Sequence, residues 1–194
     1  MKEGMQQSDE ANFVDAQLFN ELYHTMFVYP KPIIAKVEAG AYGGAIGLMA
    51  CADVVITSPE AQFQFSETAL GLIPATVAPY IVKKIGGGNA RYLLVSGIRF
   101  NGEDALRYGL AHILVHAEEL VNTTRKTAEK MATLGPQAVK KTKKLLNYLD
   151  QDTFNITQDT KNYCASLIAT ARKSEEGQER VGSFFNRNKS QTND

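Results

Sequence analysis

The feature that most constrains the fold is a run of small and apolar residues, AGAYGGAIGLMACA, at positions 39–52. The run contains no charged side chain, and short β-branched segments flank it at residues 33–37 and 53–57. Because small side chains let backbones approach closely, we expect a tight turn at Gly43-Gly44 that opens into a buried helix. Strand, short helix and strand within about 25 residues predict α/β organisation with parallel pairing of the strands.

Helical and strand patterns continue on both sides of this run. Residues 8–28 predict a helix capped by Ser8, with apolar residues recurring every four positions at Val14, Leu18, Leu22 and Met26. Further strands are predicted at residues 63–65 and 111–115. Short helices are predicted between these strands, at residues 77–85, 90–95 and 101–109, with the glycines at 86–88 separating the first two.

The last part of the chain has helical periodicity from residue 118 onward. Its second helix is expected to open at Pro136 and to bury Leu145, Leu146 and Leu149. The pattern therefore predicts two parts, a sheet-containing part at residues 1–117 and a helical region at residues 118–194.

Charge and composition exclude several classes of function. The 21 basic and 21 acidic residues balance, so no nucleic-acid footprint is expected. No apolar run reaches the roughly 20 residues of a membrane span, and no signal peptide is visible, which predicts a cytoplasmic protein without membrane contact. Cys51 and Cys164 are expected to be buried free thiols. The three histidines lack metal-ligand spacing, so no metal site is predicted.

Two places along the chain have residues suited to chemistry. The Gly43-Gly44 turn would present free backbone N–H groups at a positive helix end, which is a natural site for an anion. A purely structural turn is the competing interpretation, whereas no Lys-Ser or Lys-Thr pair follows the glycines as a phosphate loop requires. Glu67 is a carboxylate among apolar residues, which suits proton transfer near neutral pH, and an exposed loop glutamate is the alternative.

Several motifs resemble those of the enoyl-CoA hydratase/isomerase (crotonase) superfamily. Residues 31–45, KPIIAKVEAGAYGGA, are similar to that family's lysine-proline strand and glycine-rich turn. Later motifs follow in the family's order: DVVI at 53–56, AQF at 61–63, Glu67, LGLIP at 70–74, Gly97, ALRYGL at 105–110, EEG at 175–177 and Phe184. The resemblance implies an α/β fold with a crotonase-like spiral ββα core, followed by a C-terminal helical trimerisation region.

The resemblance also implies an acyl-CoA thioester as substrate and assigns roles to particular residues. The Gly44 N–H is expected to be one of two backbone donors that stabilise the enolate oxygen, and Glu67 to move protons at the α or β carbon. Other substrate contacts are expected at Gly43, Ala45, Gly47, Leu72, Pro74, Ala75, Phe184 and Lys189. No cofactor is expected beyond the coenzyme A of the substrate itself.

Gly47 stands where the family's hydratases often have a second glutamate. A single carboxylate suits a Δ3,Δ2-enoyl-CoA isomerase, whose proton moves between two carbons. The run LIPATVAPY at 72–80, however, resembles bacterial methylglutaconyl-CoA hydratases, so hydration of a 2-enoyl-CoA, with 3-methylglutaconyl-CoA from leucine breakdown as one substrate, is favoured.

The resemblance places Met1 just after the segment that supplies the second oxyanion donor. The spiral core is therefore expected to be incomplete at its N-terminus, and the chain as written to be impaired in activity. A non-catalytic acyl-CoA-binding or assembly subunit is the third alternative. The resemblance further implies a homotrimer or a dimer of trimers.

Overall fold

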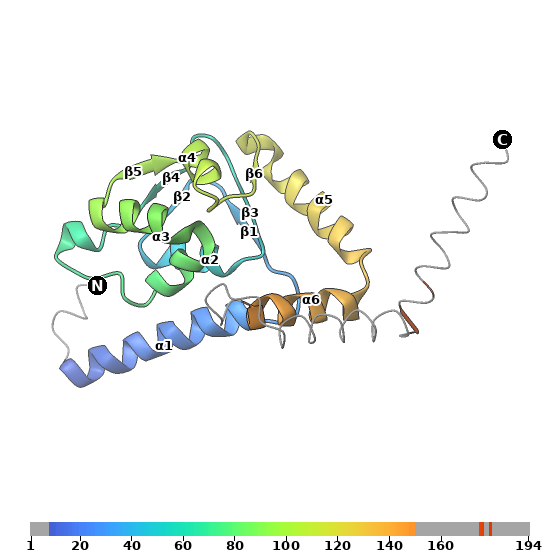
Figure 1. The fold of residues 1–194 in the computed structure, drawn as a ribbon. Helices are drawn as coiled ribbons and strands as arrows, with labels where there is room; N and C mark the ends of the chain where they lie inside the picture. The colour runs from blue at the N-terminus through green and yellow to red at the C-terminus, as the bar shows by residue number, and fades with distance from the viewer. Residues whose placement is uncertain (1–7, 150–174, 177–178, 180–194) are drawn as a thin grey trace. The chain divides into compact units, whose positions relative to one another are not determined.

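The computed structural model describes residues 8–149, 175–176 and 179 of the 194-residue chain (Figure 1). The chain forms two compact units, Met1–Glu129 and Lys130–Asp194. The first unit extends past residue 117, where the sequence pattern placed the boundary, since Leu120 at the start of the next helix is fully buried.

The first unit contains two three-stranded sheets. In the first sheet β1 (Ile34–Val37) pairs with β3 (Val54–Thr57), which pairs with β6 (Ile113–Leu114). In the second sheet β2 (Gly40–Tyr42) pairs with β4 (Gln62–Gln64), which pairs with β5 (Arg99–Asn101). All pairs are parallel except β4 with β5. The parallel pairing expected for residues 33–37 with 53–57 is thus confirmed, with Ile34 opposite Val54.

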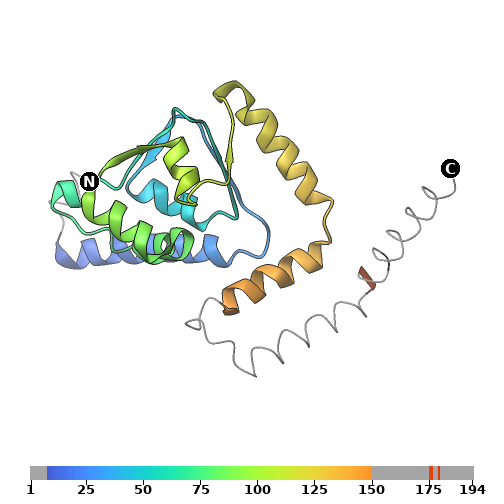
Figure 2. The same ribbon diagram turned by 45° about the horizontal axis from the view of Figure 1, so that its top comes forward.

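Helices pack around these strands. They are α1 (Asp9–Val28), α2 (Gly44–Cys51), the 3₁₀ helix η2 (Thr68–Leu70), α3 (Ala78–Ser96), α4 (Gly102–Arg107), the 3₁₀ helix η3 (Ala117–Glu119) and α5 (Leu120–Ala132). The short helix α2 packs against both α1 and α3. In both ribbon views the strands lie on one side of α2 and α1 runs along the other (Figures 1 and 2).

The expected buried helix after the glycine turn is confirmed. Five of the eight residues of α2 are buried: Ile46, Gly47, Met49, Ala50 and Cys51. The three-residue strand before it was not predicted, because Gly-Ala-Tyr has weak strand propensity. β2 forms because it pairs with β4, and a Cβ on Gly40 would lie only 1.9 Å from the Gln62 carbonyl oxygen. Glycine is therefore required there for the two backbones to meet.

The helix predicted at residues 8–28 is present, and the Ser8 side chain caps it by accepting from the Ala11 N–H. The apolar residues that recur every four positions along it are largely exposed: Val14, Leu18 and Leu22 are 48%, 63% and 45% exposed. The fully buried residue of α1 is Tyr23, at 1% exposed. The helix meets the core only near its C-terminal half, so a stripe along its whole length does not describe its packing.

The glycine run at 86–88 interrupts the helix less than expected. Only Gly86 leaves helical geometry, at φ 74° and ψ 157°, and α3 continues on both sides of it. The later helix expected at 101–109 corresponds to α4, whose N-cap Asn101 accepts from the Asp104 N–H. Gly109 follows it with φ 82°, the left-handed geometry expected after a helix end.

The second unit contains α6 (Pro136–Leu149), which begins at the predicted proline. The carboxylate of Glu176 accepts hydrogen bonds from the N–H groups of Gln137 and Ala138, at 3.1 and 2.9 Å, and so satisfies two free donors of the helix N-terminus. No residue of α6 is buried, so the buried side predicted for Leu145, Leu146 and Leu149 is wrong for the single chain. Phe184, Lys189 and Cys164 lie outside the described residues.

Candidate active site

The glycine turn joins β2 to α2 and leaves Gly44, but not the N–H of Gly43, open to an acceptor from outside. Gly43 adopts φ 52° and ψ −125°, a conformation that residues with side chains rarely adopt. Its N–H donates to the Gln64 carbonyl oxygen at 3.0 Å, which ties the turn to the end of β4. Gly44 and Ala45 follow as the first residues of α2 and are exposed. The N–H groups of a first helical turn have no acceptor within the helix, and the described residues provide no other acceptor for Gly44.

Glu67 lies beside this turn because of the parallel pairing of β2 with β4. The carboxyl ends of parallel strands meet at one edge of a sheet, and the chain leaves β4 through Phe65 and Ser66 to reach Glu67. A Cβ on Gly43 would lie 3.2 Å from Glu67 Oε1 and 3.8 Å from Ser66 Oγ. The structure therefore brings together the turn and the carboxylate, the two features that the sequence singled out.

The carboxylate of Glu67 is half-buried. Its Oε2 is shielded from solvent and has no hydrogen-bond partner among the described residues. Its main-chain carbonyl accepts from the N–H groups of Leu70 and Leu72, at 3.0 and 2.8 Å, which fixes the residue at the start of η2. A buried carboxylate oxygen without a donor retains its capacity to accept a hydrogen bond from a bound group.

Tyr23 is a further residue at the turn, and the sequence did not indicate it. Its hydroxyl donates to the Gly44 carbonyl oxygen at 3.0 Å, across 21 positions of the chain. Burial, chiefly, raises the pKa of Tyr23, with smaller contributions from Cys51 and Glu67. Sequence offers no local signal for this contact, because a tyrosine in an amphipathic helix is most simply a core residue.

The other predicted substrate contacts lie around the turn in different environments. Gly47 is fully buried below it, on the inner side of α2. Leu72, Pro74 and Ala75 lie in the loop between η2 and α3, where Leu72 is 49% exposed and the neighbouring Ile73 is 82% exposed. This loop starts directly after Glu67 and η2, so it presents uncovered apolar side chains close to the carboxylate in sequence.

A groove of about 580 Å³ runs along the free edges of β1 and β2. Its lining is mostly apolar and comes from Met26, residues 33–41, Ala45, Leu48 and Met49. Of the predicted site residues that the structure describes, Ala45 alone lines this groove, and Glu67 does not.

A second polar group lies at the opposite end of α2. Lys84 Nζ donates to the carbonyl of Ala52, the C-cap of α2, at 2.7 Å, which places a cation at the negative end of the helix. Burial lowers the pKa of Lys84 to about 8 and raises that of Cys51 to about 12. Cys51 is a buried free thiol, as expected. Lys84 thus stabilises the C-terminal end of α2, and neither Lys84 nor Cys51 contacts Glu67 in the described part of the chain.

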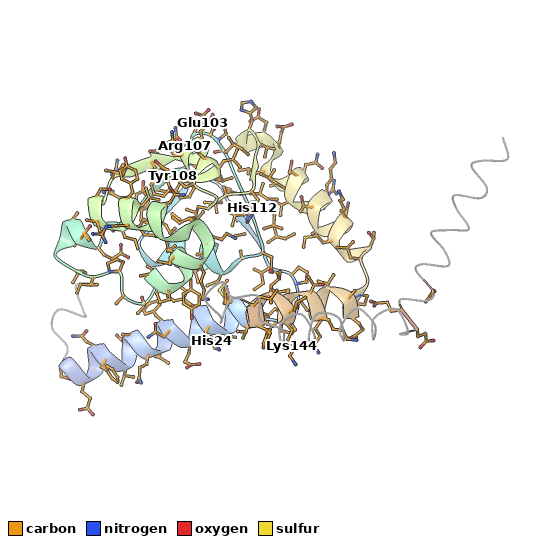
Figure 3. The ribbon with its side chains drawn as sticks, in the orientation of Figure 1. His24, Glu103, Arg107, Tyr108, His112 and Lys144 are labelled. Carbon is orange, nitrogen blue, oxygen red and sulfur yellow. The ribbon has the colours of Figure 1, made fainter. Side chains whose placement is uncertain are left out.

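The described histidines show no arrangement that suggests catalysis or metal binding. His112 Nδ1 accepts from the Val55 N–H at 2.9 Å, and partial desolvation, followed by Lys84, lowers its pKa. Figure 3 shows His24 on the side of α1 that faces away from the strands. Within the described ranges, no three His, Cys, Asp or Glu side chains gather as metal ligands, and no helix is long and apolar enough to cross a membrane.

Comparison with known proteins gives consistent matches along the chain. The family model described as enoyl-CoA hydratase/isomerase matches residues 1–192. A short-chain-enoyl-CoA hydratase of Clostridium acetobutylicum is 30% identical over 143 residues, covering 71% of this chain and 55% of the relative. A carnitinyl-CoA dehydratase of Proteus mirabilis is 34% identical over 115 residues, covering 59% of this chain and 44% of the relative.

A solved structure is similar over nearly the whole chain. The crystal structure of an enoyl-CoA hydratase from Shewanella pealeana superimposes with a TM-score of 0.89 at 33% identity, covering 96% of this chain and 69% of that chain. The chain spans about half the length of the curated relatives that it matches.

Proposed function

The chain belongs to the enoyl-CoA hydratase/isomerase family, and from this premise we propose that it adds water across the double bond of a 2-enoyl-CoA thioester. The crotonase-like α/β fold class expected from the sequence is confirmed by the likeness to the Shewanella pealeana structure. The observation that carries the proposal is the position of Glu67 beside Gly43 in the glycine turn, with its buried Oε2 lacking a hydrogen-bond donor among the described residues.

The proposed reaction uses these two groups in sequence. The thioester oxygen accepts a hydrogen bond from the Gly44 N–H, while Glu67 takes a proton from water as the water oxygen bonds to Cβ. The electron pair of the double bond then forms an enolate, whose charge the Gly44 N–H stabilises. Glu67 returns its proton to Cα, so that water is added and the carboxylate is regenerated. Protons and water are exchanged without transfer of electrons to an acceptor, so the proposal needs no redox cofactor.

The names of the relatives favour hydration. One relative is a hydratase and another a dehydratase, and both reactions add or remove water at an acyl-CoA. Within this class we propose a branched substrate such as 3-methylglutaconyl-CoA, because residues 72–80 resemble the corresponding run of bacterial methylglutaconyl-CoA hydratases. The exposed Leu72 and Ile73 beside η2 would contact the methyl-bearing part of this acyl group, whose distal end is a carboxylate.

A Δ3,Δ2-enoyl-CoA isomerase is the second candidate, and the surroundings of Gly47 favour it. A Cβ at this position would lie 2.6 Å from Val77 Cγ1, so the helix has no room for a second glutamate. One carboxylate suffices to carry a proton from one carbon to another. Incubation with a 3-enoyl-CoA separates the two reactions, because the isomerase converts it to a 2-enoyl-CoA without a 3-hydroxyacyl product.

Replacing Glu67 by Gln tests the proposal directly. The variant keeps the shape of the side chain but cannot accept the proton, so kcat for 2-enoyl-CoA hydration should fall about 10²–10⁴-fold. The protein is expressed from its complete gene, and Glu60→Gln, which changes an exposed carboxylate on the loop before β4, is the matched control. Near-normal hydration by Glu67→Gln refutes the proposed role. Binding of coenzyme A thioesters without turnover by the unmodified protein favours a non-catalytic acyl-CoA-binding subunit instead.

We further propose that the protein works in the cytoplasm as a homotrimer or a dimer of trimers. Apolar residues exposed in the single chain support an assembly, among them Phe13 and Leu18 on α1 and Leu146 on α6, at 63%, 63% and 59% exposed. Phe184 and Lys189 are proposed to approach the coenzyme A of a neighbouring subunit. Light scattering of the purified protein tests the assembly, and a monomer mass at micromolar concentration contradicts it.

A further inference from the structure

The inner side of α2 is too crowded to hold any side chain at Gly47. A Cβ there would lie 2.6 Å from Val77 Cγ1, 2.9 Å from Tyr23 Cε1 and 3.0 Å from Tyr23 Cζ. Separations below about 3 Å between such carbons are strongly repulsive. Val77 and Tyr23 are each 1% exposed, so neither has free space into which to move. The ring of Tyr23 therefore occupies the space that a side chain at residue 47 would need.

Neighbouring aromatic rings hold Tyr23 in this place. Its ring lies 5.7 Å from that of Tyr80 and 6.3 Å from that of Phe19, and Tyr80 in turn lies 5.7 Å from Phe27. Ring pairs at these separations attract one another beyond the burial of their area. The phenol is thus fixed between α1 and α3, with its hydroxyl directed at the first turn of α2.

The hydroxyl of Tyr23 contacts Gly44, one of the two residues assigned to the reaction. It donates to the Gly44 carbonyl oxygen at 3.0 Å, and a Cβ on Gly44 would lie 2.9 Å from it. On the other side of the same turn, a Cβ on Gly43 would lie 3.2 Å from Glu67 Oε1. The turn thus lies next to a phenol, which donates to it, and next to a carboxylate. A buried hydroxyl needs a hydrogen-bond acceptor, and the Gly44 carbonyl is the acceptor the structure provides.

We propose that Tyr23 is a positioning residue of this site, whose hydroxyl orients the first turn of α2 through the Gly44 carbonyl while its ring excludes a second acid at Gly47. The hydroxyl acts through the backbone, because it fixes the peptide next to the N–H that donates to the thioester oxygen. An oxyanion donor is effective only when it is held in place before the charge develops. The expected effect of Tyr23 on turnover rests on the proposed function. Its expected effect on the order of the turn rests on geometry alone.

The test compares Tyr23→Phe with Tyr80→Phe in the protein expressed from its complete gene. Both variants lose one hydroxyl from the same aromatic cluster, but only Tyr23 donates to the turn. The first measurement is kcat and KM for a 2-enoyl-CoA. For Tyr23→Phe we expect kcat to fall about tenfold with KM within about twofold, because substrate binding is retained and only the transition-state contact is misaligned. Tyr80→Phe should keep both parameters.

The second measurement needs no substrate. Hydrogen–deuterium exchange is followed at the Ile46 amide, which donates to the Gly43 carbonyl at 2.9 Å within the turn, and at the Ile56 amide in the buried strand β3. In Tyr23→Phe exchange should accelerate about tenfold at Ile46 and remain unchanged at Ile56. In Tyr80→Phe neither amide should change.

The outcomes separate this inference from the proposed function. Unchanged exchange at Ile46, or an equal increase at Ile46 and Ile56, overturns the positioning role, since the latter indicates a general loss of stability. A fall in kcat/KM through KM alone, or an equal fall in Tyr80→Phe, also overturns it. If the unmodified protein turns over no enoyl-CoA, the proposed function is refuted, and the exchange measurement alone decides the inference.

Discussion

Replacing Gly47 by Ala tests the packing beneath the turn, and Gly88→Ala is its matched control. Both glycines lie inside helices, α2 and α3, where alanine is favoured over glycine by about 1 kcal/mol of unfolding free energy. They differ in the space around them. A Cβ at Gly88 would meet no atom within 4 Å, whereas one at Gly47 would lie 2.6 Å from Val77 Cγ1 and 2.9 Å from Tyr23 Cε1.

The magnitude follows from these two contributions. Gly88→Ala should raise the free energy of unfolding by about 0.5–1 kcal/mol, because only helix propensity changes. Gly47→Ala gains the same amount but forces a carbon into a filled core, which typically costs about 1–3 kcal/mol. The two variants should therefore differ by about 1–3 kcal/mol, with Gly47→Ala the less stable.

Urea unfolding followed by circular dichroism measures this difference. With a denaturant slope of roughly 2 kcal/mol per molar urea, the midpoints should differ by about 0.5–1.5 M. Adding Val77→Ala should relieve the crowding, so the double variant should be more stable than the sum of the single changes by at least about 0.5 kcal/mol. Equal midpoints for Gly47→Ala and Gly88→Ala would show that the space under the turn is open and would refute the packing described here.

Two further predictions concern the group behind α2. Lys84 has a pKa of about 8 in the folded chain and an ordinary value of 10.5. Between these pH values the folded state binds fewer protons than the unfolded state. The free energy of unfolding, relative to that of Lys84→Met, should therefore rise with pH across this interval by about 2 kcal/mol. Urea unfolding of both proteins at pH values of about 7 and about 10 measures this, and a constant difference contradicts it. Burial raises the pKa of Cys51 to about 12, so in a Cys164→Ala variant a disulfide reagent at pH about 8 should label the chain only after unfolding. Labelling of the native variant at the rate of a free thiol would contradict that expectation.

Much of the local structure follows from local patterns. The run at 39–52 predicts a glycine turn and a buried helix between parallel strands, and both are present. Ser8 caps α1, and Pro136 opens α6, because caps and first-turn prolines act on the nearest backbone groups. Such features depend on residues a few positions apart, which a single sequence displays directly.

Patterns that depend on packing were less reliable. The four-residue spacing in α1 does not identify the residue that the core buries, since Leu18 is 63% exposed and Tyr23 is fully buried. The strand β2 was missed, because its residues favour a turn until pairing with β4 supplies hydrogen bonds. In each case the deciding partner lies far away in the chain.

The sequence by itself determined the order of strand, glycine turn and helix, and the residue types, Gly44 and Glu67, that make a site conceivable. Only the tertiary structure decided that the turn and Glu67 adjoin, because this requires β2 to pair with β4. It also decided why residue 47 is glycine: the ring of Tyr23, 24 positions earlier in the printed sequence, fills the space. Residue types report the preferences of neighbours along the chain, whereas the space around a residue depends on how distant elements pack.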